Sequence, residues 1–246
     1  MHLKNRMIIG AAFCTIALSF AAAAASAEDA STIRQYQFEP VSGKYELVLK
    51  EVPRPVASDN EVLVRVRATS LNRRDLNMLR REYDEQYSLA GTIPLSDGAG
   101  EVIAVGPGVT RFKVGDRVAG IFFEKWIDGA PSEASLETDR GGNAGGMLAE
   151  IIVTNEEGLV SIPEHLSFEE AATLPCAAVT AWVGLFKRGR VEPGQYVLLE
   201  GTGGVSVFGL IFSHALGAKP IITSSRDHKL QRAMEMGAIG TANYRN

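Results

Sequence analysis

The stretch Gly201-Thr-Gly-Gly-Val-Ser-Val-Phe-Gly209 decides the fold of the second half of this chain. It follows an apolar run, Tyr196-Val-Leu-Leu-Glu200, that is typical of a fully buried strand. Glycines lack a Cβ, so the backbone can approach a phosphate group closely, and the N–H groups of a helix start point at the anion. Ser206 stands where a third close glycine often lies, and a glycine-rich turn without a ligand is the alternative. The position between a strand and a helix favours phosphate binding.

The segment around this turn alternates between strand and helix patterns. Strands are expected at 196–200, 220–223 and 239–243, with helices at 205–216 and 227–236 between them. Such alternation requires parallel strands joined by right-handed crossovers. Upstream, Ser167 and Glu170 have the spacing of a capping box, and a further helix is expected over 180–187. The chain from 166 to 246 is therefore predicted to form the first half of a doubly wound parallel sheet.

The chain from 28 to 165 has a β-rich pattern instead. Glu61-Val-Leu-Val-Arg-Val-Arg-Ala68 alternates valine with charge, as a half-buried strand does. Further strands are expected at 100–106, just after 113–116 and at 147–153. The polar, glycine-rich segment 128–146 is predicted to be a long surface loop.

Composition and the N-terminus limit the classes of function. The 246 residues carry a formal net charge of −4 and are 46% hydrophobic, which predicts a packed core and argues against a nucleic-acid groove. Residues 1–27 combine Lys4 and Arg6, an apolar run and Ala25-Ser-Ala27, which is the pattern of a cleaved signal peptide. We expect an exported protein, periplasmic or secreted, with no stable membrane association after cleavage. A misassigned N-terminus, and hence a cytoplasmic protein, is the alternative. Only Cys176 remains after cleavage, so no intrachain disulfide is possible.

The end of the second α/β strand bears on which dinucleotide fits. An NAD site usually places Asp or Glu there to bind the ribose hydroxyls. Here the strand ends without an acid, and Asp227 is interpreted as the cap of the following helix. Hydroxyls and cations suit the 2′-phosphate of NADP(H), which a carboxylate would repel. We therefore expect NADPH rather than NADH, bound by Ser224, Ser225, Arg226 and Lys229.

Four motifs, in order along the chain, carry a resemblance to a known family. They are Ser70-Leu-Asn-Arg-Arg-Asp75, Pro107-Gly-Val-Thr-Arg-Phe-Lys-Val-Gly-Asp-Arg-Val118, Leu174-Pro-Cys-Ala-Ala-Val-Thr-Ala-Trp182 and the 201–209 turn. In this order they resemble the medium-chain dehydrogenase/reductases, and among them the zinc-independent, quinone oxidoreductase-like (alcohol dehydrogenase-like) group. The resemblance implies an α/β chain in which a GroES-like β-barrel catalytic domain at 28–165 precedes an incomplete Rossmann domain at 166–246. The cofactor would lie in the cleft between them.

The same resemblance bears on metal binding. Zinc-dependent members hold the metal with a cysteine near the L-N-x-x-D segment, a histidine in a G-H-E motif and a cysteine before the Rossmann domain. The matching positions here are Asn72-Arg-Arg74, Ser96-Asp97 and Cys176. Of these three positions, only Cys176 has the residue that the zinc-dependent members use as a ligand. A single thiolate cannot hold zinc tightly where three protein ligands are required. The four-cysteine structural lobe is also missing, because 128–146 contains no cysteine. We therefore predict no metal site.

The resemblance also implies where substrate and cofactor bind. Asn72 and Asp75 would lie near the nicotinamide, and Tyr83 matches a substrate-cleft tyrosine whose hydroxyl could donate to a substrate oxygen. A packing aromatic is the alternative for Tyr83. On the cofactor side, contacts are implied for Thr180, Gly201, Thr202, Gly203, Gly204, Val205 and Tyr244.

Four arginines cluster next to the L-N-x-x-D segment, namely Arg73, Arg74, Arg80 and Arg81. Glu82, Asp84 and Glu85 follow them closely enough to form ion pairs on a helix. We interpret the cluster as a solvated helix face rather than as an anion site.

These motifs predict an NADPH-dependent, zinc-free oxidoreductase that transfers hydride to a quinone, an enone or a related carbonyl. The alternatives are a truncated, non-catalytic remnant with weak nucleotide binding, and an NAD(P)-dependent alcohol dehydrogenase. In the Rossmann order 3-2-1-4-5-6 the sequence provides strands 3, 2 and 1, so strand 1 would be an exposed edge. The family's usual dimer-forming strand is not predicted either. We therefore expect a fragment of low stability and low activity.

Overall fold

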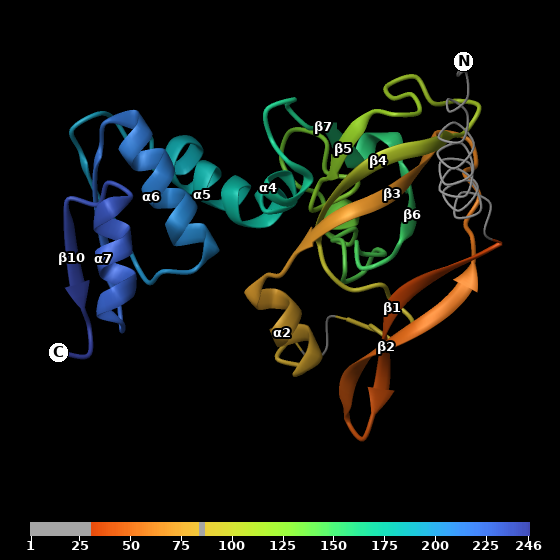
Figure 1. Ribbon diagram of the computed structural model, residues 1–246, viewed down its shortest axis with the longest axis horizontal. Helices are drawn as coiled ribbons and strands as arrows, with labels where there is room; N and C mark the ends of the chain where they lie inside the picture. Colours follow the sequence, from red (N-terminus) through yellow and green to blue (C-terminus); the bar gives the residue numbers. More distant parts are fainter. Residues whose placement is uncertain (1–30, 84–86) are drawn as a thin grey trace, which may run out of the picture.

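The computed structural model describes residues 31–83 and 87–246. A β-rich part, residues 32–161, and an α/β part, residues 168–243, lie at opposite ends of the chain in Figure 1. The signal peptide predicted at 1–27 lies outside the described residues. Across the described ranges, no helix combines the length and the apolar character needed to cross a bilayer.

An antiparallel sheet with β3 near its centre forms the core of the β-rich part. Its order is β6-β3-β4-β5-β7, with β3 (Glu61–Ser70), β4 (Asp97–Val105), β5 (Arg117–Gly120), β6 (Ile151–Asn155) and β7 (Leu159–Ser161). The strands predicted at 61–68 and 100–106 are confirmed with small shifts at their ends. The strand predicted at 147–153 begins only at Ile151.

The strand β3 is more deeply buried than its sequence pattern predicts. Val62, Leu63 and Val64 are all buried, although they point alternately to the two faces of the sheet. Val62 and Val64 join the main core cluster, whereas Leu63 packs against Ile33 and Ile151 on the other face. The prediction of a half-buried strand is therefore wrong over 62–64. One core cluster covers the strand on one face, and a second core cluster covers it on the other.

A β-hairpin precedes this sheet in the chain and lies beside it in Figure 1. The strands β1 (Thr32–Val41) and β2 (Lys44–Pro53) pair in antiparallel register from Thr32 opposite Pro53 to Val41 opposite Lys44. The turn residues Ser42 and Gly43 have φ values of 50° and 83°. Two consecutive positive φ angles match the right-handed twist of hairpin strands.

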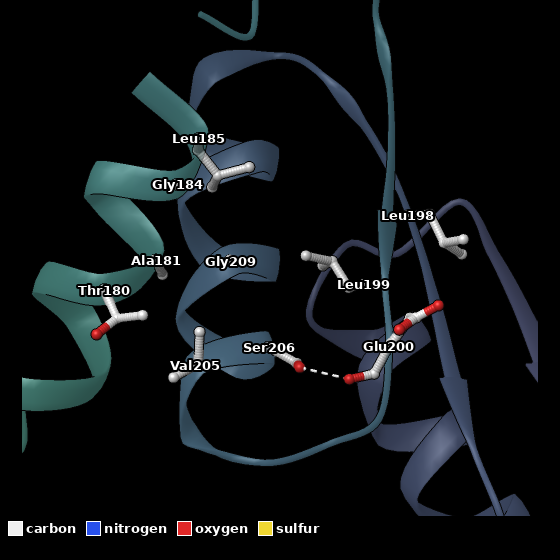
Figure 2. Close-up of a pocket in the computed structure, with 10 residues that line it drawn as sticks. All are labelled: Thr180, Ala181, Gly184, Leu185, Leu198, Leu199, Glu200, Val205, Ser206 and Gly209. Atoms are coloured by element: carbon white, nitrogen blue, oxygen red, sulfur yellow. Dashed lines mark hydrogen bonds between the residues drawn. The ribbon is translucent and has the colours of Figure 1, made fainter. Parts of the chain in front are cut away.

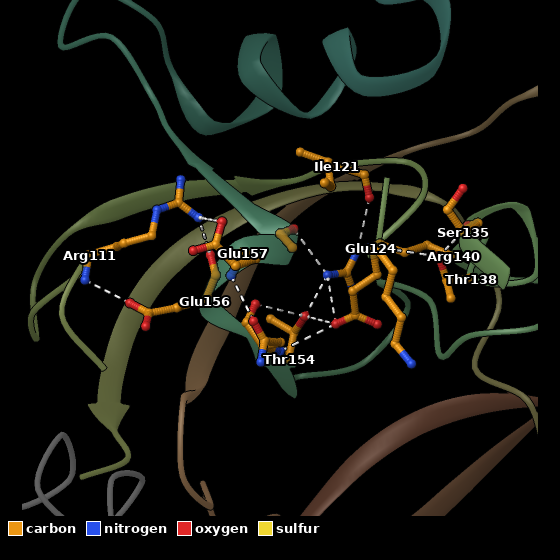
Figure 3. A network of polar contacts seen from close by, with 12 residues as sticks. Arg111, Ile121, Glu124, Ser135, Thr138, Arg140, Thr154, Glu156 and Glu157 are labelled. Carbon is orange, nitrogen blue, oxygen red and sulfur yellow. Dashed lines mark hydrogen bonds and ion pairs between the residues drawn. The ribbon is translucent and has the colours of Figure 1, made fainter. Parts of the chain in front are cut away.

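Residues 121–146, called the lobe below, are held by the buried side chain of Arg140. This side chain is 2% exposed and donates to the carbonyl oxygen of Ile121 at 3.0 Å and to Thr154 Oγ1 at 2.5 Å, as Figure 3 shows. A buried guanidinium is tolerated when hydrogen bonds and an acid, here Glu124 at 3.4 Å, replace its water. The surface loop predicted at 128–146 is thus an anchored lobe, and it includes the short helix α3 (Glu133–Leu136).

The α/β part contains the parallel sheet that the sequence predicts. Its order is β10-β9-β8, with β8 (Tyr196–Leu199), β9 (Lys219–Ser224) and β10 (Gly240–Asn243) joined by α6 (Gly204–Leu216) and α7 (Asp227–Glu235). The capping box at Ser167 and Glu170 is present and begins α4 (Phe168–Ala172), which packs on β3 and β4. The helix predicted at 180–187 is a longer helical run that alternates between π-helical and α-helical turns, namely η2 (Leu174–Ala178), α5 (Val179–Trp182) and η3 (Val183–Arg188).

The strand β8 lies at the edge of this sheet and is buried on one face only. Val197 and Leu199 pack into the cluster formed with α6 and α7, whereas Tyr196 is 69% and Leu198 63% exposed. The prediction of a fully buried strand is therefore wrong. Both helices cover the same face of the sheet, and no element of the described chain covers the other face at Tyr196 and Leu198.

We predict that Gly146→Ala destabilises the protein strongly, because a Cβ at Gly146 would lie 2.1 Å from the carbonyl oxygen of Pro94. Backbone atoms cannot yield as a flexible side chain does, so we expect a loss of roughly 2–4 kcal/mol in the free energy of unfolding. The neighbouring substitution Gly145→Ala is the matched control, because its Cβ would meet nothing within 4 Å. Urea unfolding followed by circular dichroism measures both. Equal stability of the two variants would contradict this packing.

Candidate functional site

The turn between β8 and α6 has the backbone geometry that phosphate binding requires. Gly201 has a φ of +79°, in the region that favours glycine, and Gly203 is the N-cap of α6. A Cβ at Gly203 would meet nothing within 4 Å, so the space in front of the helix start is open. Gly209 has a packing role, because a Cβ there would lie 2.8 Å from Cδ2 of Leu199. The first N–H groups of α6 lack acceptors within the helix and can bind an anion.

A cavity of about 420 Å³ lies beside this turn, between α5, α6 and β8 (Figure 2). It is lined by Thr180, Ala181, Gly184, Leu185, Leu198, Leu199, Glu200, Val205, Ser206 and Gly209. Thr180 and Val205, both predicted from the resemblance, therefore border the same space. Ser206 Oγ donates to the carbonyl oxygen of Glu200 at 2.8 Å and ties the helix start to the strand end.

Hydroxyl groups meet where β8 and β9 end. Thr202 Oγ1 and Ser224 Oγ lie 3.2 Å apart, and the N–H of Gly201 donates to Thr223 Oγ1 at 3.0 Å. Ser224 is 4% exposed, so its hydroxyl is held in place rather than solvated. The structure thus brings together the glycine turn and the serine that the sequence predicts at the strand tip.

The other predicted residues of the strand tip follow this pair in the chain and are more exposed. Arg226 and Lys229 are exposed to solvent, and Ser225 is half-buried. The N–H of Tyr244 donates to the carbonyl oxygen of Ser224 at 3.2 Å, while the Tyr244 residue is 66% exposed. Two cations and two hydroxyls therefore occur close together in the chain at the end of β9.

The interpretation of Asp227 as a helix cap is wrong. Arg226 is the N-cap of α7, and Asp227 is the first residue inside the helix. Its carboxylate accepts a hydrogen bond of 2.6 Å from Asn243 Nδ2, because β10 brings Asn243 alongside the helix start. The carboxylate therefore links α7 to the end of β10.

A second polar cluster lies at the start of α2 (Arg73–Leu79), with Asn72 as its N-cap. The buried Asp75 accepts a hydrogen bond of 2.6 Å from the backbone N–H of Asn72 through Oδ2. Among the described residues, Asp75 Oδ1 and Asn72 Nδ2 are buried and have no hydrogen-bond partner. Buried polar atoms without partners are costly and are concentrated at functional sites. Two of the three residues predicted as catalytic therefore lie in this cluster: Asp75 Oδ1 is a free acceptor, and the Asn72 side-chain amide is close enough to Asp97 to lower the pKa of that carboxyl.

Asp97, at the start of β4, joins this cluster to the α/β part. It is fully buried, and its carboxylate accepts hydrogen bonds from Ser96 Oγ at 2.6 Å and from the N–H of Cys176 at 3.0 Å. Asp97 lies within electrostatic range of Asp75. The sequence predicts no role in the site for Asp97, which stands at a position where zinc-dependent relatives hold a metal ligand. The match of Ser96-Asp97 to the histidine position of the G-H-E motif is the sequence feature that could have identified Asp97 as a site residue.

Burial controls the protonation of this cluster. It raises the pKa of Asp75 and of Asp97, because a desolvated carboxylate is less stable as an anion. Hydrogen bonds to Asp97 and the positive charge of Arg74 act in the opposite direction. Burial, with the nearby Asp97, also raises the pKa of the Cys176 thiol to about 11. The site therefore holds two constrained acids and a thiol that stays protonated at neutral pH.

The structure corrects the interpretation of the arginine cluster for one member. The Arg74 side chain is 11% exposed and forms an ion pair of 2.5 Å with the buried Asp139. Arg73 donates to Asn77 Oδ1, and Arg80 pairs with Glu82, both near the surface as predicted. Arg74 differs because the lobe covers its side of α2.

Tyr83 occupies a different position from Asp75 and Asp97. Its hydroxyl accepts a hydrogen bond of 3.2 Å from Asn77 Nδ2, and its ring packs edge-on against Tyr87 at 6.2 Å. It is 39% exposed and borders residues 84–86, which lie outside the described ranges. The alternative packing role is compatible with these contacts, and a substrate contact stays a prediction.

Among the side chains that the structure describes, no group of three or more His, Cys, Asp or Glu residues could hold a metal ion. Cys176 is half-buried, and Asp97 binds its backbone rather than its thiol. His165, His214 and His228 are exposed.

The chain is similar in sequence to known oxidoreductases. Residues 58–164 match the alcohol dehydrogenase GroES-like domain. A zinc-type alcohol dehydrogenase-like protein of Schizosaccharomyces pombe is 46% identical over 197 residues, which are 79% of this chain and 56% of that protein. Quinone oxidoreductase-like protein 2 of Bos taurus is 33% identical over 204 residues, or 82% of this chain and 52% of that protein.

Solved structures show the same relationship. An alcohol dehydrogenase-type protein from Sinorhizobium meliloti superposes with a TM-score of 0.81 at 39% identity, over 87% of this chain and 63% of that one. A quinone oxidoreductase from Pseudomonas syringae superposes with a TM-score of 0.69 at 31% identity, over 86% and 59% of the respective chains. The chain thus spans between half and two thirds of the length of the relatives it matches.

We predict that Asp75→Asn leaves the protein at least as stable as the wild type at pH 8. Burial raises the pKa of Asp75, so its contribution to stability is complete at low pH and is lost as the pH rises through the folded-state pKa. Asparagine keeps a capping oxygen without the charge, whereas Asp75→Ala loses the cap and should cost about 1 kcal/mol. Urea midpoints at pH 5 and pH 8 measure this. A difference between wild type and Asp75→Asn that does not change with pH would contradict it.

We also predict that iodoacetamide alkylates Cys176 slowly in the native protein at pH 8. A thiol pKa near 11 leaves little thiolate at that pH. The same thiol should react rapidly in urea, where burial no longer raises its pKa. Mass spectrometry of the peptide that contains Cys176 gives both rates, and fast alkylation of the folded protein at pH 8 would disprove the prediction.

Proposed function

Because the chain belongs to the medium-chain dehydrogenase/reductase superfamily, we propose that it is part of an NADPH-dependent oxidoreductase. Its substrate would be a quinone, an enone or a related carbonyl. The observation that carries the proposal is the presence of two clusters of functional residues in the same chain. One is the open glycine turn at Gly201–Gly204 with its hydroxyl pair, and the other is the buried group of Asn72, Asp75 and Asp97.

The residues of the first cluster fit a dinucleotide. The N–H groups at the start of α6 would hold the pyrophosphate, and Thr180 and Val205 border the adjoining cavity. Ser224, with Thr202, would contact the adenosine ribose, and Arg226 and Lys229 would neutralise a 2′-phosphate. When bound, the nicotinamide supplies hydride for the reaction.

The second cluster would serve the substrate. Negative charge develops on a carbonyl or quinone oxygen as it is reduced, and hydrogen-bond donors aimed at that oxygen lower the barrier. Asn72 Nδ2 is a buried donor beside Asp97, whose pKa it lowers, and a substrate oxygen in the same place could accept from it. Asp75 would hold Asn72 in place through the backbone N–H. Tyr83 is the candidate for a further donor at the edge of the site.

Two other functions compete with this one. An NAD(P)-dependent alcohol dehydrogenase is supported by relatives of that name, several of which are called zinc-type. A stoichiometric zinc ion in the purified protein would favour it over the zinc-free proposal. A protein that binds nucleotide weakly without catalysis is the other alternative. A folded protein that binds NADPH and reduces no quinone, enone or ketone would favour that alternative.

Export is a separate proposal, which rests on the signal-peptide pattern of residues 1–27. NADPH is a cytoplasmic cofactor, so an exported enzyme would have to bind it before translocation. Cell fractionation with N-terminal sequencing of the mature form tests this. A cytoplasmic protein that keeps Met1 would remove both the proposal and the difficulty.

We predict that Arg226→Ala weakens NADPH binding about tenfold and leaves NADH binding unchanged, because only NADPH carries the 2′-phosphate. Arg232→Ala is the matched control, since Arg232 lies on the same helix but pairs with Glu235 at 2.9 Å. Fluorescence titration with each nucleotide gives the dissociation constants. Equal weakening for NADPH and NADH, or a preference for NADH in the wild type, would overturn the assignment of NADP(H).

A further inference from the structure

We propose that Arg74 is a positioning residue of the substrate site, held by the lobe so that it fixes the first turn of α2 and balances the charges of Asp75 and Asp97. The inference rests on the proposed function for its catalytic meaning. Its structural content, a largely buried cation held by several contacts, can be tested without measuring enzyme activity.

Arg74 is held from three sides. Its Nη2 pairs with Asp139 Oδ2 at 2.5 Å, and its Nη1 donates to the carbonyl oxygen of Arg140 at 2.7 Å. The guanidinium carbon lies 4.7 Å above the ring of Phe122. Asp139 is itself fixed, because Asn143 Nδ2 donates to its Oδ1 at 3.0 Å. A side chain held by a charged pair, a carbonyl and an aromatic face has little freedom to move.

The lobe that holds Arg74 is itself anchored in the protein core. Asp139 and Arg140 are neighbours whose side chains bind different partners: Asp139 binds Arg74 on α2, and Arg140 binds into the polar network of Figure 3. Arg140 binds Thr154 and the carbonyl oxygen of Gly158 there. Two adjacent residues of the lobe, Asp139 and Arg140, therefore link α2 to the antiparallel sheet.

The same lobe contacts the segment that leads into Asp97. The N–H of Gly146 donates to the carbonyl oxygen of Ile93 at 2.8 Å, and Gly141 and Gly146 pack directly on the backbone of Pro94 and Leu95. One rigid unit thus positions both α2, which carries Asn72 and Asp75, and the strand start that carries Asp97. Glycine is required at Gly146 because the backbones approach too closely for a Cβ.

The charges around Arg74 support a balancing role. The groups within its electrostatic range are Asp75 on its own helix, Asp97 on β4, Cys176 on η2, and Tyr87 and Asp139 on the covering segments. Its positive charge lowers the pKa of Asp75, of Asp97 and of the Cys176 thiol, against the effect of burial. Tyr87 completes the cluster, since its hydroxyl is within hydrogen-bonding range of Arg74 and Asp139.

The test uses the Cys176 thiol as a reporter of this charge. Arg74→Met should raise the thiol pKa and slow native alkylation at pH 9 by ~3-fold, because one nearby positive charge is lost. Arg73→Met is the matched control, since the exposed Arg73 binds Asn77 instead, and should leave the rate unchanged. Arg74→Lys, which keeps the charge, should stay near the wild-type rate. If Arg74→Met fails to fold, the double variant Arg74→Met with Asp139→Asn removes both buried charges and should slow alkylation in the same way.

The catalytic consequence is read from the pH profile of NADPH-dependent quinone reduction. Arg74→Met should move the acidic limb to higher pH and lower kcat, with NADPH affinity unchanged, whereas Arg73→Met should match the wild type. Unchanged alkylation in the folded Arg74→Met and double variants would overturn the inference. A predicted alkylation shift in a protein without reductase activity would leave the inference standing and reject the proposed function.

Discussion

The hydrogen bond from the N–H of Cys176 to the buried carboxylate of Asp97 is the contact on which the candidate site depends. Asp97 begins a strand of the antiparallel sheet, and Cys176 lies in the helical run that leads to the parallel sheet. A fully buried carboxylate needs such donors, because desolvation otherwise makes its charge costly. The same bond that stabilises the acid therefore also joins the β-rich part to the α/β part.

The buried acids are tolerated because polar groups converge on them from several elements. Ser96 and Cys176 donate to Asp97, the N–H of Asn72 donates to Asp75, and Arg74 supplies a positive charge to both. A buried cation in turn needs an anion, which Asp139 provides from the lobe. The lobe is fixed by Arg140, so the charge balance of the site depends on a network outside it.

Several features of the α/β part follow directly from local sequence. The glycine turn, the order of strands and helices, and the capping box at Ser167 are set by residues close together in the chain, and the structure confirms them. The turn at Gly201 and the tip at Ser224 lie together for the same reason, because they follow adjacent strands, and cofactor binding there stays a prediction. Asp227 was misjudged, since its partner Asn243 comes from a different strand.

The substrate side was harder to read, because its contacts join segments far apart in sequence. The motif predicts Asn72 and Asp75 as site residues but says nothing of Arg74, which the lobe covers and which pairs with Asp139. The exposure of Tyr196 and Leu198 also could not be read from an apolar strand, because burial depends on which faces the helices cover.

The sequence by itself therefore determined the strand and helix order of the α/β part, the glycine turn after β8 and the residue types available for chemistry, since these depend on local spacing and backbone freedom. Only the tertiary structure decided which acids are buried, which arginine is locked beside them and which thiol stays protonated. Those properties depend on desolvation and on charges brought together from distant segments, which no local pattern records.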